Sequence, residues 1–178
     1  TATLPSGVAL HVGYDLCSHT LALRVSDGTY FDYVPLPHYG QDVSFISEPV
    51  AVGSKFAVGV GVDDEFLVVL FDQFGGEVID SISRTIGGAG CALLLDGGSN
   101  LAAVYPHYDG VFYSIQYEVV GSNSPEEVVS GAAAAGGILD AIYTPSASAV
   151  DIVNAAGSNI NWCRFRPGLG PVAATLLD

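Results

Sequence analysis

Short apolar runs separated by glycine-rich turns recur along the whole chain. Val, Ile, Phe and Tyr dominate the runs, and 22 glycines and 9 prolines lie mostly between them. Runs of this kind, bounded by turn residues, predict β-strands. Residues 56–62 are apolar at nearly every position, which is typical of a strand covered on both faces, whereas residues 77–82 alternate and predict one wet face. Short helices are indicated only at 124–129, which begins Ser-Pro-Glu-Glu, and at 132–135.

Four segments share one layout: an apolar strand, a second strand, a tight hairpin and a third strand. Each hairpin is assigned a glycine 18 to 20 residues after its segment starts, and Asp-Gly or Gly-Gly pairs supply the positive φ that tight hairpins need. The hairpin glycines are Gly28, Gly76, Gly110 and Gly157. The sequence therefore predicts a single all-β domain over residues 1–178, with antiparallel three- or four-stranded units at 8–36, 56–83, 91–120 and 137–166.

Units of about 45 residues that begin with a buried strand and end with a half-wet one resemble the blades of a β-propeller. The resemblance covers most of the chain but is architectural, because no Trp-Asp, kelch or hemopexin signature is present. A β-sandwich or compact barrel built from the same strands is the alternative. The third unit is short for a full blade, which favours that alternative.

The charge of the chain excludes several classes of partner. There are 19 acidic against 5 basic residues, a formal net charge of −14, and Lys55 is the only lysine. Nucleic acids and anionic membranes would be repelled, because both need clustered Lys or Arg. No uncharged apolar run reaches the roughly 18 residues of a membrane span. The chain begins at Thr1 and contains no methionine, from which we expect a mature fragment or an excised domain.

The surface is expected to be poor in charge. Only 13% of residues are charged and 49% are hydrophobic, whereas soluble domains carry roughly a quarter charged residues. We therefore expect a homo-oligomer or a larger assembly to cover part of it. Cys17, Cys91 and Cys163 show no metal-binding spacing. A bridge between Cys17 and Cys163 and a set of buried, inert thiols both remain open.

Motifs for catalysis and cofactor binding are missing from the sequence. No Gly-x-Ser-x-Gly nucleophile motif occurs, and the Gly-rich residues 87–90 lack the Lys-Ser/Thr of a phosphate-binding loop. We expect no catalytic residue and no cofactor. Among 19 acids a pair facing a cleft can always be imagined, so a glycan-acting hydrolase is kept as the alternative.

Ligand contacts are expected at two similar turns. Pro-His-Tyr occurs at residues 37–39 and again at 106–108, and such turns can present a ring and an imidazole at a loop tip. The alternative is that the tyrosines pack back on the sheet. Aromatic residues on third strands are further candidates, since Tyr and Trp favour contact surfaces. The candidate ligand-binding residues are His38, Tyr39, His107, Tyr108, Tyr113 and Trp162.

Acidic turns give weak calcium candidates, although no firm metal site is predicted. Asp63 and Asp64 lie in one strand-to-strand turn, and Asp96 begins what is taken as the matching turn of the next unit. Clustered oxygens on glycine-containing turns can bind calcium, but turn formation alone also explains them.

The function that these features favour is a non-enzymatic recognition or assembly module. Low charge density, scarce lysine and aromatic loops on a rigid β scaffold are typical of a protein displayed on a particle or cell. A virus or phage capsid projection that binds a receptor or glycan has this character, which gives an extracellular or virion-surface location. This last step, from a surface protein to a capsid projection, rests on analogy alone.

Overall fold

The structure is a computed structural model in which almost every described element is a β-strand. It describes residues 2–3, 9–15, 20–25, 31–35, 43–62, 65–72, 75–83, 90–131 and 136–177. Within these ranges the exception is one 3-10 turn, η2 (Pro145–Ala147). The all-β prediction is confirmed.

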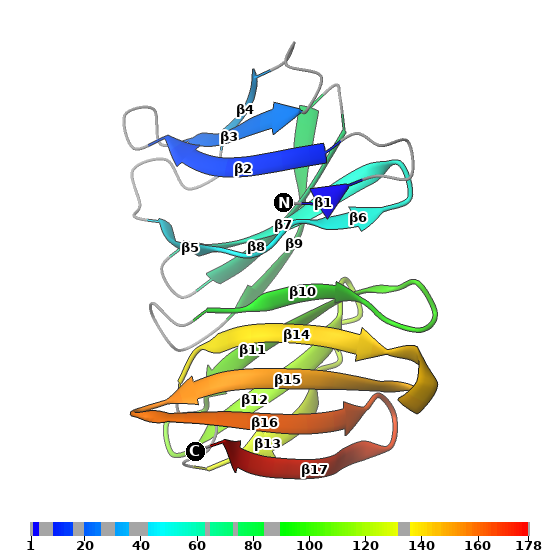
Figure 1. The fold of residues 1–178 in the computed structure, drawn as a ribbon. Coiled ribbons are helices and arrows are strands. Elements are labelled where there is room, and N and C mark those ends of the chain that lie inside the picture. The colour runs from blue at the N-terminus through cyan, green and yellow to red at the C-terminus, as the bar shows by residue number, and fades with distance from the viewer. Residues whose placement is uncertain are drawn as a thin grey trace.

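Four antiparallel sheets follow one another along the chain (Figure 1). The first sheet consists of β1 (Ala2–Thr3), β2 (Ala9–Asp15), β3 (Thr20–Val25) and β4 (Phe31–Pro35). The second consists of β5 (Val43–Ile46), β6 (Val50–Val52), β7 (Lys55–Val62), β8 (Glu65–Asp72) and β9 (Gly75–Ser83). The third consists of β10 (Ala92–Leu95), β11 (Leu101–Tyr108), β12 (Tyr113–Val119) and β13 (Glu126–Ser130). The fourth consists of β14 (Ile138–Thr144), β15 (Ala149–Ala156), β16 (Asn159–Arg166) and β17 (Gly170–Leu177).

The repeat is more regular than the sequence pattern suggests. The second strands of the four sheets begin at residues 9, 55, 101 and 149, so the steps are 46, 46 and 48 residues. The predicted units begin on this second strand in the first two sheets, but on the first strand, β10 or β14, in the last two. The short predicted third unit therefore results from a shift of one strand in the alignment.

Two of the predicted hairpin glycines lie in turns as expected. Gly110 and Gly157 have φ of 98° and 63° between β11 and β12 and between β15 and β16. Gly76 does not, because Gly75 and Gly76 begin β9 and pair with Asp72 and Phe71. The connection there is residues 73–74, and Gly28 lies outside the described residues.

Neither of the two predicted helices is observed among the described residues. Residues 126–130 form strand β13, which pairs with β12, so sheet pairing overrides the local helix-start signal. Residues 132–135 lie outside the described part of the chain.

One edge of the second sheet is made by two short strands, because β5 and β6 both pair with β7. Ser47 lies at the break between them. Its N–H donates to the Gly59 carbonyl at 2.8 Å, and its Oγ accepts from the Gly59 N–H at 2.8 Å, so a side chain supplies the acceptor that a continuous strand would offer. Any Cβ at residue 59 would enter the ring of Phe66, which stacks on Phe45 with centroids 5.8 Å apart.

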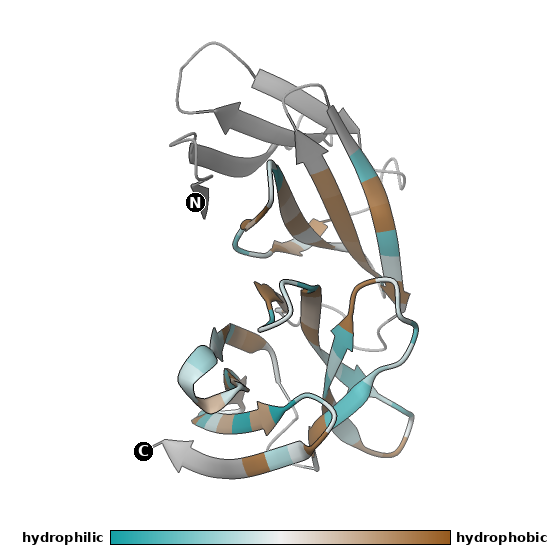
Figure 2. Ribbon diagram, turned by 90° about the vertical axis from the view of Figure 1, so that its right-hand side faces the viewer, coloured by the Kyte–Doolittle hydropathy of each residue, from teal (hydrophilic) through white to brown (hydrophobic). Residues whose placement is uncertain are grey.

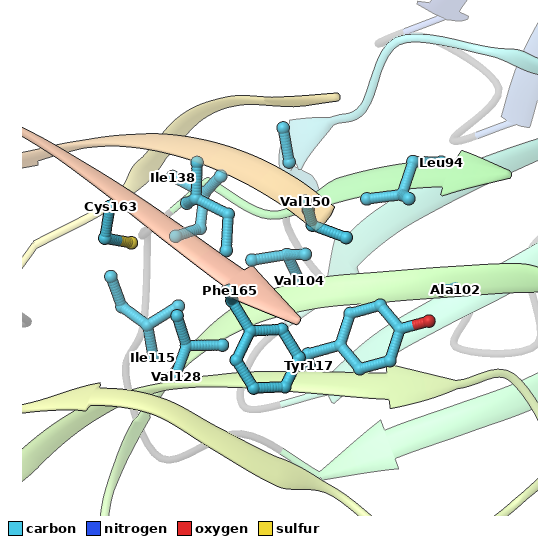
Figure 3. Packing of buried hydrophobic residues seen from close by; sticks show 12 residues of the cluster. Leu94, Ala102, Val104, Ile115, Tyr117, Val128, Ile138, Val150, Cys163 and Phe165 are labelled. Carbon is cyan, nitrogen blue, oxygen red and sulfur yellow. The ribbon is translucent and has the colours of Figure 1, made fainter. Parts of the chain in front are cut away.

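Face-to-face packing of successive sheets makes the core. One cluster joins the second and third sheets and includes Phe66, Val68, Leu93 and Tyr105. A second joins the third and fourth sheets, where the rings of Tyr117 and Phe165 meet at 5.4 Å (Figure 3). Figure 2 shows apolar segments along the strands, and polar segments both in the turns and within some of the strands.

A similar hydrogen bond connects successive sheets in two places. Asp80 on β9 accepts at 2.7 Å from the backbone N–H of Gly121, in the β12–β13 loop of the next sheet. Glu126 on β13 accepts at 2.7 Å from the backbone N–H of Gly168, in the β16–β17 loop. In both cases a carboxylate on the last strand of one sheet binds a glycine N–H in the last loop of the following sheet.

The sheets are arranged in series, with the first and fourth at opposite ends of the molecule (Figure 1). A sandwich would bring two large sheets together, and a barrel would close a single sheet on itself. Four separate sheets that pack in chain order fit neither alternative.

We expect Gly59→Ala to destabilise the fold by about 2 kcal/mol, because the added methyl group must displace the Phe66 ring from a packed core. Chemical denaturation followed by circular dichroism measures the change. Ser54→Ala, on the exposed β6–β7 turn, is the control and should change stability by less than about 0.5 kcal/mol. Equal effects of the two substitutions would contradict the close packing described for Gly59.

Candidate recognition surface

The β11–β12 hairpin is closed by its own acidic residue. Asp109 Oδ1 accepts from the backbone N–H of Val111 at 2.8 Å and from that of Phe112 at 2.7 Å. The Asp109 N–H in turn donates to the Phe112 carbonyl at 3.2 Å, and Gly110 supplies the positive φ. An aspartate that binds backbone two and three residues ahead is a common way to fix a turn. The tip is therefore held in one conformation.

The hydrogen bonds to Asp109 also determine its acidity. The N–H groups of Phe112 and then Val111 lower the pKa of the Asp109 carboxyl from its usual value, because they stabilise the charged form. The turn is therefore in its closed, ionised form throughout the neutral range.

Two tyrosines support the base of the hairpin. Tyr108 and Tyr113 are opposite one another in the ladder, and their rings stack with centroids 4.6 Å apart. The Tyr108 hydroxyl donates to the Gly110 carbonyl at 2.9 Å. Both tyrosines therefore stabilise the turn, as in the alternative reading of the Pro-His-Tyr motif.

The side chains that the tip presents to solvent are Val111 and Phe112, with exposed fractions of 70% and 63%. His107 is half-buried on β11, opposite Ser114. The sequence predicted Tyr108 and Tyr113 as ligand-binding residues and did not indicate Val111 or Phe112. The available signal was the Asp-Gly pair at residues 109–110, which is followed at once by two apolar residues.

The remaining candidate ligand-binding residues do not join this hairpin. Trp162 is half-buried on β16, and the Arg164 guanidinium lies over its ring at 5.4 Å from the centroid. Trp162 lies on the face of the fourth sheet that points away from the third sheet, and the third sheet carries the hairpin. His38 and Tyr39 lie outside the described residues.

The calcium candidates do not form one type of turn. Asp63 and Asp64 lie outside the described residues. In the chain they fall between β7 and β8, the second and third strands of their sheet. Asp96 instead follows the first strand, β10, of the next sheet. The two turns therefore do not match, for the same reason that the repeat alignment shifts by one strand. Within the described ranges, no three His, Cys, Asp or Glu residues are grouped so that they could hold a metal ion.

Asp96 has a structural role in its own loop. Its Oδ1 accepts from the N–H groups of Gly98 at 2.8 Å and Asn100 at 2.9 Å, and its Oδ2 accepts from the Asn100 amide at 3.0 Å. The Tyr117 hydroxyl also donates to Oδ2 at 3.3 Å. Burial alone would raise the pKa of Asp96, but these hydrogen bonds outweigh it and lower the pKa.

Other acids near the core are also held in structural hydrogen bonds. Glu118 is buried and accepts from the Tyr105 hydroxyl at 2.8 Å. Burial, followed by the bond to Glu118, raises the pKa of Tyr105. Glu126 binds the Gly168 N–H as described above. These contacts fix the sheets and do not form a pair of carboxylates presented to a substrate.

Cys163 is a buried free thiol in the core between the third and fourth sheets. Burial raises its pKa to about 11, which disfavours the reactive thiolate. The alternative of a bridge to Cys17 is not observed at Cys163, and Cys17 lies outside the described residues. Cys91 is buried in the core between the second and third sheets. In the described residues, no helix is long and apolar enough to cross a membrane.

The arrangement of the four sheets is similar to parts of known protein structures. The crystal structure of TolB from Acinetobacter baumannii matches 94% of this chain with a TM-score of 0.57 and 18% identity. A structure from a study of two prolyl endopeptidases matches 100% of it with a TM-score of 0.58 and 15% identity. The matched parts are β-propeller domains. The fold is β-propeller-like.

This likeness concerns the fold alone, because both identities are below a quarter. The propeller-like chain spans 40% of the TolB chain and 29% of the endopeptidase chain. No family model matches the sequence. No curated protein matches it either.

We expect Asp109→Ala to loosen the hairpin tip without unfolding the sheets. The substitution removes the acceptor of the Val111 and Phe112 N–H groups, so these amides should exchange with solvent at least about tenfold faster. Hydrogen exchange followed by NMR measures this, and Asp140→Ala is the control at an exposed acid on β14. Unchanged exchange at the tip would contradict the assigned role of Asp109.

Acidification should open the same turn. The folded-state pKa of Asp109 is lowered, so the contribution of the turn is present above the unfolded pKa and is lost as the pH falls through the folded value, below 3.8. An NMR titration of the Asp109 carboxyl, compared with the Val111 and Phe112 amide shifts, should give one common midpoint below 3.8. A midpoint above that value would overturn the assignment.

Proposed function

We propose that this chain is a non-enzymatic recognition module of propeller type that binds through the tip of the β11–β12 hairpin. The observation that carries the proposal is the exposure of Val111 and Phe112 on a turn fixed by Asp109 and by the Tyr108–Tyr113 stack. The target is a receptor or glycan, and the setting is a particle or cell surface such as a virus or phage capsid projection.

Rigid presentation is the physical argument for binding. Contact between an exposed aromatic side chain and water is unfavourable, and a partner that covers the side chain removes this cost. Aromatic anchors contribute much of the affinity at interfaces. A turn that is ordered before binding does not have to be ordered by the partner, which lowers the entropic cost of association. Phe112 fulfils both conditions, and Val111 adds exposed apolar surface beside it.

The composition supports the surface setting and limits the charge that a partner can carry. With a net charge of −14 the chain repels acidic surfaces, so the partner is neutral or basic where it meets the hairpin. The glycan-hydrolase alternative is not proposed, because Asp96, Glu118 and Glu126 are occupied by structural hydrogen bonds.

We expect Phe112→Ala to reduce binding at least tenfold, because truncating an aromatic anchor costs about 2 kcal/mol. A fluorescent form of the chain is applied to a glycan array and to a panel of intact cells, and the variant is compared with the wild type on every surface that the wild type binds. Leu169→Ala is the matched control, since Leu169 is 81% exposed on the β16–β17 loop, at the other end of the strands. Equal losses in both variants, or none in Phe112→Ala, would overturn the assignment to the hairpin.

A further inference from the structure

We propose that the partner of the β11–β12 hairpin is a protein with an apolar pocket that takes up Val111 and Phe112, and not a glycan. This partner class rests on the proposed role of the hairpin and makes it more specific. It follows from the hydrogen bonds within the tip, from the exposure of its two apolar side chains and from the charge of the sheet that carries it.

The polar groups of the tip are bonded within the turn. The N–H groups of Val111 and Phe112 donate to Asp109 Oδ1, and the Asp109 N–H donates to the Phe112 carbonyl. The Gly110 carbonyl accepts from the Tyr108 hydroxyl. A backbone N–H is a single donor, so these N–H groups cannot bind a ligand while the turn is closed.

A bound sugar needs groups of this kind. Its hydroxyls lose hydrogen bonds to water when the ring stacks on an aromatic side chain, and the binding site has to replace them. At this tip the backbone donors of Val111 and Phe112 point inward, to Asp109. The tip therefore offers apolar contact without the accompanying donors, which suits an apolar pocket in a protein better than a sugar.

The length of the tip and its exposure fit entry into a pocket. In the neighbouring sheets the β7–β8 and β15–β16 connections have two residues each, 63–64 and 157–158. The β11–β12 connection has four, 109–112. Val111 and Phe112 are both mostly exposed, so the chain itself does not enclose them. Side chains that dominate an interface are typically enclosed by a pocket of the partner.

Charge indicates what lies around the pocket. Residues 90–131, which contain the third sheet, include no Lys or Arg and five acidic residues: Asp96, Asp109, Glu118, Glu126 and Glu127. Asp109 is exposed beside the two apolar side chains and is ionised in the neutral range. Basic groups at the rim of the pocket complement this charge and speed association. Neutral and acidic glycans provide no such complement.

Treated cells distinguish a protein partner from a glycan. The fluorescent chain is applied to intact cells that bind it, either untreated, after mild periodate oxidation, which cleaves the vicinal diols of sugars, or after digestion with a broad-specificity protease. Binding should survive periodate and be lost after protease. Added NaCl should weaken it, because salt screens the attraction between the acidic sheet and a basic rim.

Substitutions of Phe112 give a second test. Phe112→Leu keeps an apolar side chain and removes the aromatic face, whereas Phe112→Tyr keeps the face and adds a hydroxyl. In an apolar pocket Phe112→Tyr should weaken binding at least about tenfold, because its hydroxyl is buried without a partner, and Phe112→Leu should weaken it less. Stacking on a sugar would give the reverse order. Leu169→Ala is again the control, and circular dichroism should show every variant folded, since Phe112 and Leu169 are exposed.

The outcomes separate this inference from the proposed function on which it rests. Binding that is lost after periodate, survives protease, strengthens with NaCl or falls more in Phe112→Leu than in Phe112→Tyr overturns the protein pocket. If Phe112→Ala still impairs that binding, the role of the hairpin stands. Wild-type binding by Phe112→Ala, or a chain that binds no cell and no glycan on the array, overturns both.

Discussion

The structure depends on one constraint, which is that a central strand in each of the second and third sheets is apolar on both faces and must be covered on both. β7 is buried from Phe56 to Val62, and β11 is buried from Ala102 to Pro106. A single partner sheet covers only one side, so a sandwich cannot satisfy such strands. Packing the sheets in series covers both sides of the inner ones. The serial order and the cores between the sheets both follow from this requirement.

Many of the acidic residues have a place in this arrangement. Polar groups within or beside a sheet-to-sheet interface need partners, and the chain supplies them locally. Tyr105 and Glu118 pair inside one sheet, whereas Asp80 and Glu126 reach the glycine N–H groups of the next sheet. Three of the acidic residues that give the chain its negative charge thus have a structural role.

The conformation of the hairpin tip is determined differently from that of the sheets. Inside a sheet, burial determines which side chains are tolerated, but at the β11–β12 tip the Asp109 turn determines the conformation and leaves Val111 and Phe112 in solvent. The fold can therefore hold this tip steady without depending on the side chains of Val111 and Phe112. Such independence makes a loop suitable for recognition, since its residues can change while the scaffold remains.

The sequence by itself determined the all-β class, the number of units and several turns, because strand periodicity and turn glycines are local properties of the chain. Gly110 and Gly157 were located in this way. Only the tertiary structure decided which strand begins each sheet and that residues 126–130 form a strand. It also decided that Tyr108 and Tyr113 support the hairpin while Phe112 is presented. The reason is that pairing and burial depend on neighbours distant in the chain, and a shift of one strand leaves the local pattern unchanged.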